Sequence, residues 1–408
     1  MRFKSVISLV FLVISLISCS EGEYKIVNVA TPIYMSKSDF RKSVEILPPK
    51  SIIESGKIYT YNNLVLVNDV KKGIHIINNS NPENPVKIAF IKVIASTDME
   101  IKGNYLYVNS LMDLVVFNIS DIKNIVEVAR LEDVFPNYTD YPTMENLVFD
   151  FSNESLEGKI IVDWKITKEE RLIEDTYYEM DFATTKALSL ASTGQGGSLA
   201  RFKIVDEFLY AVDSHNINIF NISNLDAPQE LQDVNAGFDI ETIFNSGDLL
   251  FLGSMSGMYI YNISSPAVPI FISEFSHGTA CDPVIVDSNY AYITLRAGNS
   301  CGAFASSLEI VDITDINNLE LVKSYRMDNP YGLGLKGDLL FICDGTSGLK
   351  VNNKTDVKNL VLEDVFEEVT AFDVIPMTNK LLMIGENMLY QYNYTDNGLD
   401  LLSEFSLN

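Results

Sequence analysis

Carboxylates are the side chains of this sequence that are best placed to do chemistry. Four aspartates lie at the start of apolar runs that are typical of β-strands, namely Asp98, Asp239, Asp282 and Asp373. Carboxylates that face one axis repel each other unless a cation or hydrogen-bond donors compensate them, which predicts a site for calcium or for a polar ligand. The alternative is that each aspartate accepts hydrogen bonds from the backbone N–H groups of its own turn. His277 lies in a loop of the same kind and completes the candidate ligand-binding residues.

Sequence motifs of catalysis and of cofactor binding are missing. The chain has three His and four Cys among 408 residues, with no nucleophile elbow, Walker loop or zinc-ligand spacing. The glycine-rich stretch at 194–197 is not followed by the Lys and the Ser or Thr of a phosphate-binding loop. We therefore predict no catalytic residue, no metal ligand set and no cofactor apart from the calcium alternative, and the sequence favours a protein that is not an enzyme.

The charge balance restricts the partners of the protein. Lys and Arg number 30 against 55 Asp and Glu, so the net charge is -25. A polyanion is repelled by phosphate backbones, which argues against nucleic acid as a partner. Hydrophobic residues make up 47% of the chain and charged residues 21%, which indicates a globular protein.

The N-terminus predicts export and a lipid anchor. Two positive charges at Arg2 and Lys4 precede an apolar stretch at 6–17, which is too short to span a bilayer and is typical of a secretory signal. The stretch ends in Leu-Ile-Ser-Cys at 16–19, which resembles the lipobox of bacterial lipoproteins, where the cysteine thiol carries the lipid. We predict a signal peptide at 1–18, lipid attachment at Cys19, and a tether and lead-in segment at 19–55. The alternative is an ordinary signal peptide with an incidental cysteine.

An internal repeat organises the rest of the chain. A strand-like tetrapeptide begins at Leu64, Tyr105, Phe208, Leu249, Tyr290, Leu339 and Leu381, with spacings of 41 to 49 residues and one of 103. After most copies comes an Asn or Asp, a further residue and a hydroxyl residue, as at Asn118, Asn221 and Asn262. Because these tripeptides recur in phase with the repeat, we interpret them as turns and not as glycan acceptors. A period near 40 residues with several short strands is typical of the blades of a β-propeller.

The predicted fold is therefore all-β, a single β-propeller over 56–408 with four-stranded antiparallel blades. In the unit at 238–275 we expect strands at 238–244, 249–252, 258–263 and 270–275. The spacing of 103 leaves room for a divergent blade at 136–197. Counting it gives eight blades, which we favour, and seven is the alternative. One short helix is expected at 36–44.

Several segments resemble the LVIVD-repeat family of bacterial and archaeal surface proteins, and in particular its Bacteroidetes lipoproteins. The matching segments are 73–85 (GIHIINNSNPENP), 110–121 (SLMDLVVFNISD), 257–266 (GMYIYNISSP), 281–287 (CDPVIVD), 332–334 (GLG) and 341–345 (FICDG). The resemblance implies a propeller at the cell outer membrane, held by its lipid anchor and exposed at the cell surface. It implies no particular activity, because none is established for the family.

Together these features favour a binding or scaffold protein at the cell envelope, with a protein or a glycan as its ligand. The alternative is an enzyme that acts on extracellular polysaccharide through carboxylates on the propeller face. A third class is a structural envelope protein without a small ligand.

We predict a disulfide between Cys281 and Cys301. Cys281 opens an inner strand and Cys301 lies in an extended loop of the same blade, so both project to one face, and the exported compartment permits oxidation. Closing a loop of this length stabilises the fold by about 3 kcal/mol on the chain-entropy estimate. Peptide mapping without reductant should recover the two cysteines in one cross-linked fragment. A Cys281 peptide that is free, or that is linked to Cys343, contradicts the assignment.

Overall fold

The computed structural model describes residues 23–136, 141–142, 144–151, 157–173, 199–277, 283–297, 305–396 and 398–408. Cys19, Asp282 and the predicted Cys281–Cys301 pair lie outside these residues. The described chain divides into two compact units. The hairpin unit contains residues 23–36 and 141–173 as far as they are described, and the meander unit contains 37–136 and the described residues from 199 to 408.

The meander unit is built from seven successive antiparallel meanders. In chain order their strands are β3 (Ser55–Tyr61), β4 (Leu64–Asp69), β5 (Gly73–Asn78) and β6 (Val86–Lys92); β7 (Met99–Lys102), β8 (Tyr105–Ser110), β9 (Asp113–Asn118) and β10 (Val126–Leu131); β13 (Phe202–Val205), β14 (Phe208–Val212), β15 (Asn216–Asn221) and β16 (Gln229–Glu230); β18 (Ile240–Ser246), β19 (Leu249–Ser254), β20 (Gly257–Asn262) and β21 (Ile270–Ser276); β22 (Val284–Val286), β23 (Tyr290–Leu295), β24 (Ser307–Asp312) and β25 (Glu320–Arg326); β26 (Leu333–Lys336), β27 (Leu339–Cys343), β28 (Leu349–Asn353) and β29 (Val361–Phe366); β30 (Ala371–Pro376), β31 (Lys380–Gly385), β32 (Met388–Thr395) and β33 (Gly398–Ser406). Two short strands extend two of these sheets: β2 (Glu45–Leu47) pairs with β6, and β17 (Val234–Asn235) pairs with β15. The four strands expected within 238–275 are confirmed in order and approximate bounds.

The turns of the meanders explain why the repeat signature carries asparagine. The side-chain oxygen of Asn118 accepts a hydrogen bond of 2.9 Å from the backbone N–H of Ser120, two residues further on. Asn221 makes the same bond to the N–H of Ser223, and Asn262 to that of Ser264. Such turns end the third strand and reverse the chain. The turn-forming interpretation of these tripeptides is thus confirmed.

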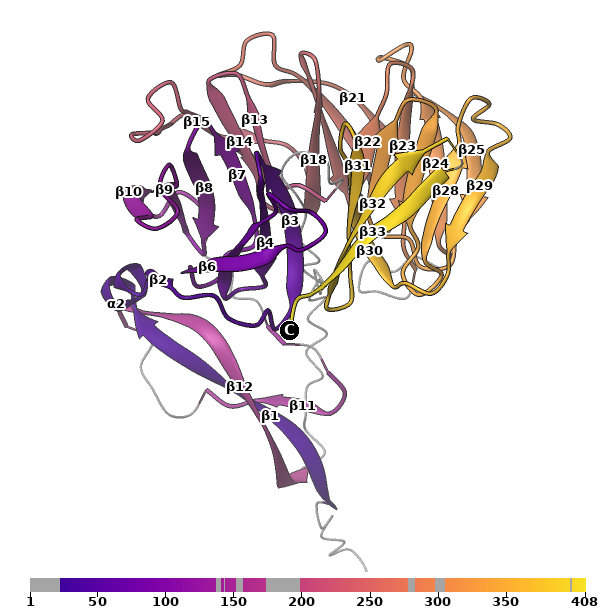
Figure 1. Cartoon of the computed structure of the whole chain (residues 1–408). Helices are drawn as coiled ribbons and strands as arrows, with labels where there is room; N and C mark the ends of the chain where they lie inside the picture. The colour runs from indigo at the N-terminus through magenta and orange to yellow at the C-terminus, as the bar shows by residue number, and fades with distance from the viewer. Residues whose placement is uncertain are drawn as a thin grey trace, which may run out of the picture. The chain divides into compact units, whose positions relative to one another are not determined.

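The seven meanders follow one another around a ring. The first strand of each meander contacts the first strand of the next, from β3 through β7, β13, β18, β22 and β26 to β30. The last meander packs against the first, since Ile375 and Leu382 share a buried cluster with Ile58 and Val67. Two hydrogen bonds of 2.9 Å between the side-chain amides of Asn79 and Gln391 join the same two meanders. Figure 1 shows the successive meanders side by side, from purple to yellow. This arrangement defines a propeller-like all-β fold.

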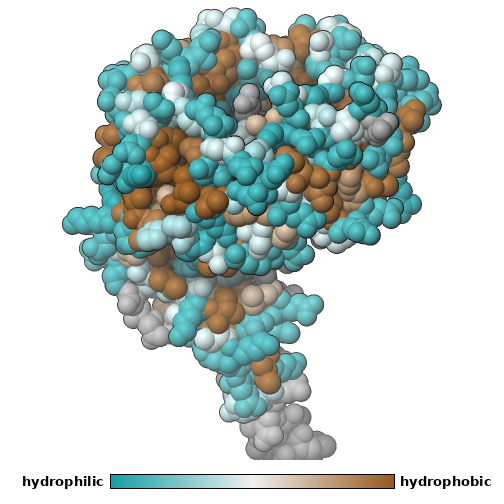
Figure 2. Space-filling view, viewed as in Figure 1, coloured by the Kyte–Doolittle hydropathy of each residue, from teal (hydrophilic) through white to brown (hydrophobic). Residues whose placement is uncertain are grey.

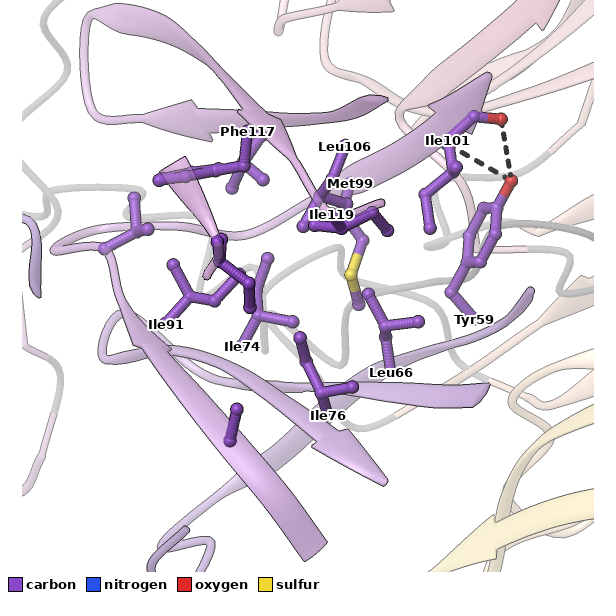
Figure 3. Close-up of a cluster of buried hydrophobic side chains, with 14 of the residues drawn as sticks. Tyr59, Leu66, Ile74, Ile76, Ile91, Met99, Ile101, Leu106, Phe117 and Ile119 are labelled. Atoms are coloured by element: carbon purple, nitrogen blue, oxygen red, sulfur yellow. Dashed lines mark hydrogen bonds between the residues drawn. The ribbon is translucent and has the colours of Figure 1, made fainter. Parts of the chain in front are cut away.

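Apolar side chains fill the space between neighbouring meanders. Figure 3 shows the cluster between the first two, in which Leu66 and Ile76 of one meander face Met99 and Leu106 of the next. The Tyr59 hydroxyl bonds to the backbone of Ile101 across this boundary, at 3.2 Å from its nitrogen and 3.3 Å from its oxygen. Because a single meander cannot bury both of its faces, each depends on its two neighbours for its core.

The outer edges of the meanders expose single apolar side chains. Four outer strands begin with a β-branched residue that is 55% to 60% exposed and lies opposite the turn residue of the third strand, namely Val86, Val126, Ile270 and Val361. Figure 2 shows brown apolar patches among teal hydrophilic residues on the visible face. The repeat therefore places apolar contact points at its outer edges.

The hairpin unit is a three-stranded sheet in the order β11-β1-β12. β1 (Glu23–Ser36) pairs antiparallel with β12 (Lys159–Ile173) along its whole length, and β11 (Leu147–Phe149) pairs parallel with the middle of β1. The rings of Tyr141, Phe149, Phe151 and Trp164 pack together with centroids 5.2 to 6.1 Å apart. Aromatic packing of this kind stabilises a sheet that is too small to have a large core.

The structure corrects the divergent blade that the sequence predicts at 136–197. In the described part of that segment, β11 and β12 pair with β1 and do not form a four-stranded meander. The reason is that β1 offers β12 a partner of 14 residues, which no strand in the described part of 136–197 provides. The described residues form eight sheets, and seven of them are meanders.

A short helix within the lead-in segment contacts the second meander. The helix expected at 36–44 is confirmed as α2 (Lys37–Lys42). Arg41 of this helix donates hydrogen bonds of 2.9 and 3.1 Å to Asp113 and forms an ion pair with Asp133 at 3.0 Å. In the described residues, no helix has the length and apolar character needed to cross a membrane.

Candidate functional site

Charged side chains gather on four neighbouring inner strands. Lys57 lies on β3, Asp98 directly precedes β7, Glu100 lies on β7, Lys203 on β13 and Asp373 on β30. Lys57 is fully buried, and the exposed fractions of Asp98, Glu100 and Asp373 are 2%, 5% and 1%. We call these five residues the inner charge cluster. Charges in such a place are costly unless they are paired or change their protonation.

Asp98 is the best bonded member of the cluster. It forms an ion pair with Lys57, and its Oδ1 accepts a hydrogen bond from the N–H of Met99. Its Oδ2 accepts hydrogen bonds from the N–H groups of Arg201 and Phe202, at 2.5 and 2.7 Å. These partners belong to β3 and to the start of β13, so one carboxylate connects three meanders. Both oxygens are thereby used by the fold itself.

Asp373 is buried with one oxygen unsatisfied. Its Oδ1 accepts a hydrogen bond of 2.9 Å from the N–H of Val374, and its Oδ2 has no partner among the described residues. Burial raises the pKa of Asp373 to about 8, against the opposing effects of that N–H group and of the positive charge of Lys57. Gly332 makes room for it, because a Cβ there would lie 2.3 Å from Asp373 Oδ1. At neutral pH most of the Asp373 carboxyl is therefore protonated.

Two further members, Glu100 and Lys57, respond to burial in the same way. Burial raises the pKa of Glu100, although the positive charges of Lys203 and Lys57 favour its ionised form. Burial also lowers the pKa of Lys57 well below its usual value, against the attraction of Glu100 and Asp373. Low polarity thus pushes these groups toward their neutral forms. The cluster is an interior network whose charge is reduced, and it differs from the exposed carboxylate ring that the sequence suggests.

The other predicted site residues lie elsewhere or are not described. Asp239 precedes β18 in a left-handed conformation with φ of 48°, and its backbone oxygen accepts a hydrogen bond from the N–H of Met255. His277 follows the outer strand β21, where its N–H bonds to the oxygen of Ser256. The structure thus brings Asp98 and Asp373 to Lys57 and places Asp239 at a turn. Asp282 lies outside the described residues.

The expectation that the aspartates occupy equivalent strand starts is corrected by the strand register. Met99 pairs with the fourth residue of the tetrapeptide in its meander, and Asp373 pairs with the corresponding Ile384, so Asp98 and Asp373 differ by one position. In β18 the residue equivalent to Asp98 is Thr242, three positions after Asp239. Irregularities in β18 and β30 insert a residue and change which side chain faces the neighbouring meander.

Metal binding at the cluster stays a prediction. In the described ranges, no group of three or more His, Cys, Asp or Glu side chains is arranged to hold a metal ion. At Asp98 the compensating charge is the ammonium group of Lys57. A calcium ion would need carboxylate oxygens that are free to ligate it, and Asp98 has none to spare.

Sequence reasoning missed Lys57, Glu100 and Lys203. A signal for them exists, because each is a charged residue directly flanked by an apolar residue that the strand buries, namely Ile58, Met99 and Phe202. It also missed a second set of buried aspartates at the ends of second strands. Asp69 accepts hydrogen bonds from the N–H groups of Ile53 and Glu54, and Asp344 accepts one from the N–H of Asn329 and pairs with Lys350. These carboxylates hold loops that lie 15 or 16 residues earlier in the chain, which differs from the capping of an aspartate's own turn.

Comparisons with known proteins agree with this fold. No protein-family model matches the sequence, and a search of curated proteins finds no match. A protein from Lactobacillus plantarum has a similar solved structure, with a TM-score of 0.53, 10% identity, and coverage of 86% of this chain and 94% of that one. The computationally designed protein Ika8 has a TM-score of 0.52 at 10% identity, with 88% of each chain covered. A functionally unknown protein from Desulfotomaculum acetoxidans has a TM-score of 0.50 at 14% identity, with 84% and 95% covered. At these identities the likeness concerns the fold alone.

We predict that Asp98→Asn destabilises the protein by about 3 kcal/mol. The single carbonyl oxygen of the amide can accept either from Lys57 or from the N–H groups of Arg201 and Phe202, and the NH₂ group then faces the remaining donors without being able to accept from them. Urea denaturation measures the effect. The matched control is Asp312→Asn, which keeps the oxygen that accepts the N–H of Thr314 and introduces the residue that other meanders carry at this position. Equal stability of Asp98→Asn and the control would contradict the structural role of Asp98.

We also predict a pH effect at Asp373. Since its pKa is raised in the folded state, its contribution to stability is fully present below about pH 4 and is lost as pH rises toward 8. Asp373→Asn, which resembles the protonated carboxyl, should therefore gain stability relative to the wild type between pH 5 and pH 8.5. Thermal unfolding across this range tests it, with the exposed Asp400→Asn as control. An unchanged difference between wild type and variant over the range refutes the prediction.

Proposed function

We propose that the protein is an exported, lipid-anchored, seven-bladed β-propeller that acts as a binding or scaffold protein at the outer membrane. The seven meanders, with the last packed on the first, support the propeller. The lipobox-like sequence before Cys19 supports the anchor. Only Ser20, Glu21 and Gly22 separate that cysteine from β1, so an anchored hairpin unit starts close to the lipid.

The observation that carries the proposal is how the inner carboxylates are used. Both oxygens of Asp98 are bonded within the fold, and Glu100 and Asp373 are at least 95% buried. A glycoside hydrolase needs two carboxyl groups that face the scissile bond, one as acid and one as base or nucleophile. The inner carboxyl groups are hydrogen-bonded within the fold or buried. This supports a binding protein over the polysaccharide-active enzyme.

The surface of the meander unit supports contact with a partner. The outer strands present exposed apolar residues such as Ile270 and Val361 at the same place in four of the seven repeats. A repeated arrangement of this kind suits an extended partner that contacts several meanders at once, whether protein or glycan. With a net charge of -25, the protein favours neutral or cationic partners over polyanions.

The anchor is tested by Cys19→Ser, which removes the thiol that accepts the lipid. We expect the variant to lose incorporation of labelled fatty acid and to leave the membrane fraction, because the lipid is the attachment to the membrane in this proposal. The control is Cys343→Ala, since Cys343 is buried and cannot be the lipid acceptor.

The same strains test the binding role. Surface cross-linking on intact cells, followed by purification of the protein, should recover envelope components with the wild type and with Cys343→Ala, and fewer with Cys19→Ser. Unchanged membrane association of Cys19→Ser would refute the anchor. Turnover of surface polysaccharide by the purified protein, abolished in Asp373→Asn, would replace the binding role with the enzymatic one.

A further inference from the structure

A buried arginine stands apart from the inner charge cluster. Arg296 directly follows β23, and its side chain lies over the ring of Tyr331, with the guanidinium carbon 4.1 Å from the ring centroid. Arg296 is 9% exposed. A guanidinium group stays charged at every physiological pH, so burial cannot remove its charge.

Among the described residues, Arg296 has no partner of the kind that such a charge requires. Within the described part of the chain, no carboxylate forms an ion pair with it, and its Nη1 is buried without a hydrogen-bond partner. Arg41 and Arg130 offer a contrast, because both bind Asp113. An unpaired buried cation costs several kcal/mol. That cost is unexpected in a chain with 55 acidic and 30 basic residues, where carboxylates are abundant.

The surroundings of Arg296 hold it in place without neutralising it. The Tyr331 hydroxyl accepts a hydrogen bond of 3.3 Å from the side-chain amide of Asn329. The backbone oxygen of Tyr331 accepts one of 2.8 Å from the Thr294 hydroxyl. The Phe372 ring packs edge-on against Tyr331 at 5.1 Å. The aromatic ring under the guanidinium group is thus fixed from three sides. A cation–π contact uses the face of the guanidinium group and does not supply an acceptor for the N–H groups in its plane.

We propose that Arg296 and Tyr331 form a binding site for the carboxylate group of a small ligand. The planar guanidinium group donates two parallel hydrogen bonds, which match the two oxygens of a carboxylate. A single cation in a strongly acidic protein favours a monoanion, because a polyanion is repelled by the remaining charge. The carboxylate supplies the missing countercharge and hydrogen-bond acceptor at once. The site goes beyond the proposed function and does not depend on the lipid anchor.

The test uses the purified full-length protein and two carboxylate probes, sodium glucuronate and sodium N-acetylglycine, each replacing sodium chloride at constant ionic strength. At least one probe should raise the melting temperature of the wild type through binding to the folded state, whereas neutral glucose should not. Arg296→Gln should raise the dissociation constant for that probe at least about tenfold, since it removes charge-assisted hydrogen bonds. Arg326→Gln, which changes an exposed arginine of β25, should behave as the wild type.

The probes also distinguish the source of the carboxylate. A response to glucuronate alone assigns the site to acidic sugars, and a response to N-acetylglycine alone assigns it to amino-acid or peptide carboxylates. If neither probe stabilises the wild type more than chloride does, or if Arg296→Gln responds equally, the proposal is overturned.

A second variant separates binding from a purely structural role. In buffer without carboxylates, Arg296→Met should be at least as stable as the wild type, because an apolar side chain of similar length removes the uncompensated buried charge. A loss of several degrees in melting temperature for this variant would show that the arginine serves packing on Tyr331, and would contradict the proposal.

Discussion

The carboxylate of Asp98 is the interaction on which the inner part of the meander unit depends. It accepts hydrogen bonds from two N–H groups at the start of β13 and pairs with the ammonium group of Lys57 on β3. Without it, two backbone donors and one cation would be buried without partners, each at a cost of about 1 to 3 kcal/mol or more. Three successive meanders are therefore fixed by one side chain, while apolar packing between their faces supplies most of the stabilisation.

The use of inner carboxylates within the fold is also the reason why we propose a binding function. An acidic chain has many carboxylates, and those nearest the centre of the ring are bonded by the fold or shielded from solvent. Asp98 is fully bonded, and burial raises the pKa of Asp373 and of Glu100, which favours their protonated forms. Four of the seven meanders also expose an apolar residue at their outer edge, such as Ile270. In the proposed binding role these repeated positions are the contact points for a partner.

The sequence predicts the local features of the fold well and the long-range ones poorly. Turn residues such as Asn118 and Asn262 and the tetrapeptide spacing depend on neighbours within one repeat, so periodicity reveals them. The pairing of β1 with β12 joins strands more than 120 residues apart, and no local pattern encodes it. Asp239 lies three residues before the position in β18 that is equivalent to Asp98, and strand irregularities at β18 and β30 add a residue that periodicity alone does not reveal. Arg296 could not be singled out, because its burial and the absence of a countercharge among the described residues appear only in the structure.

Native-state hydrogen exchange at the amides of Arg201 and Phe202 tests directly whether Asp98 holds the inner strands of neighbouring meanders together. These two N–H groups donate to Asp98 across the boundary between meanders, at the first residues of an inner strand, where fraying would otherwise be expected. We predict that both amides exchange only through global unfolding of the meander unit, so that their free energy of opening equals that of the core amides of β14. Exchange of either amide through local opening, at a rate typical of strand ends, would contradict it.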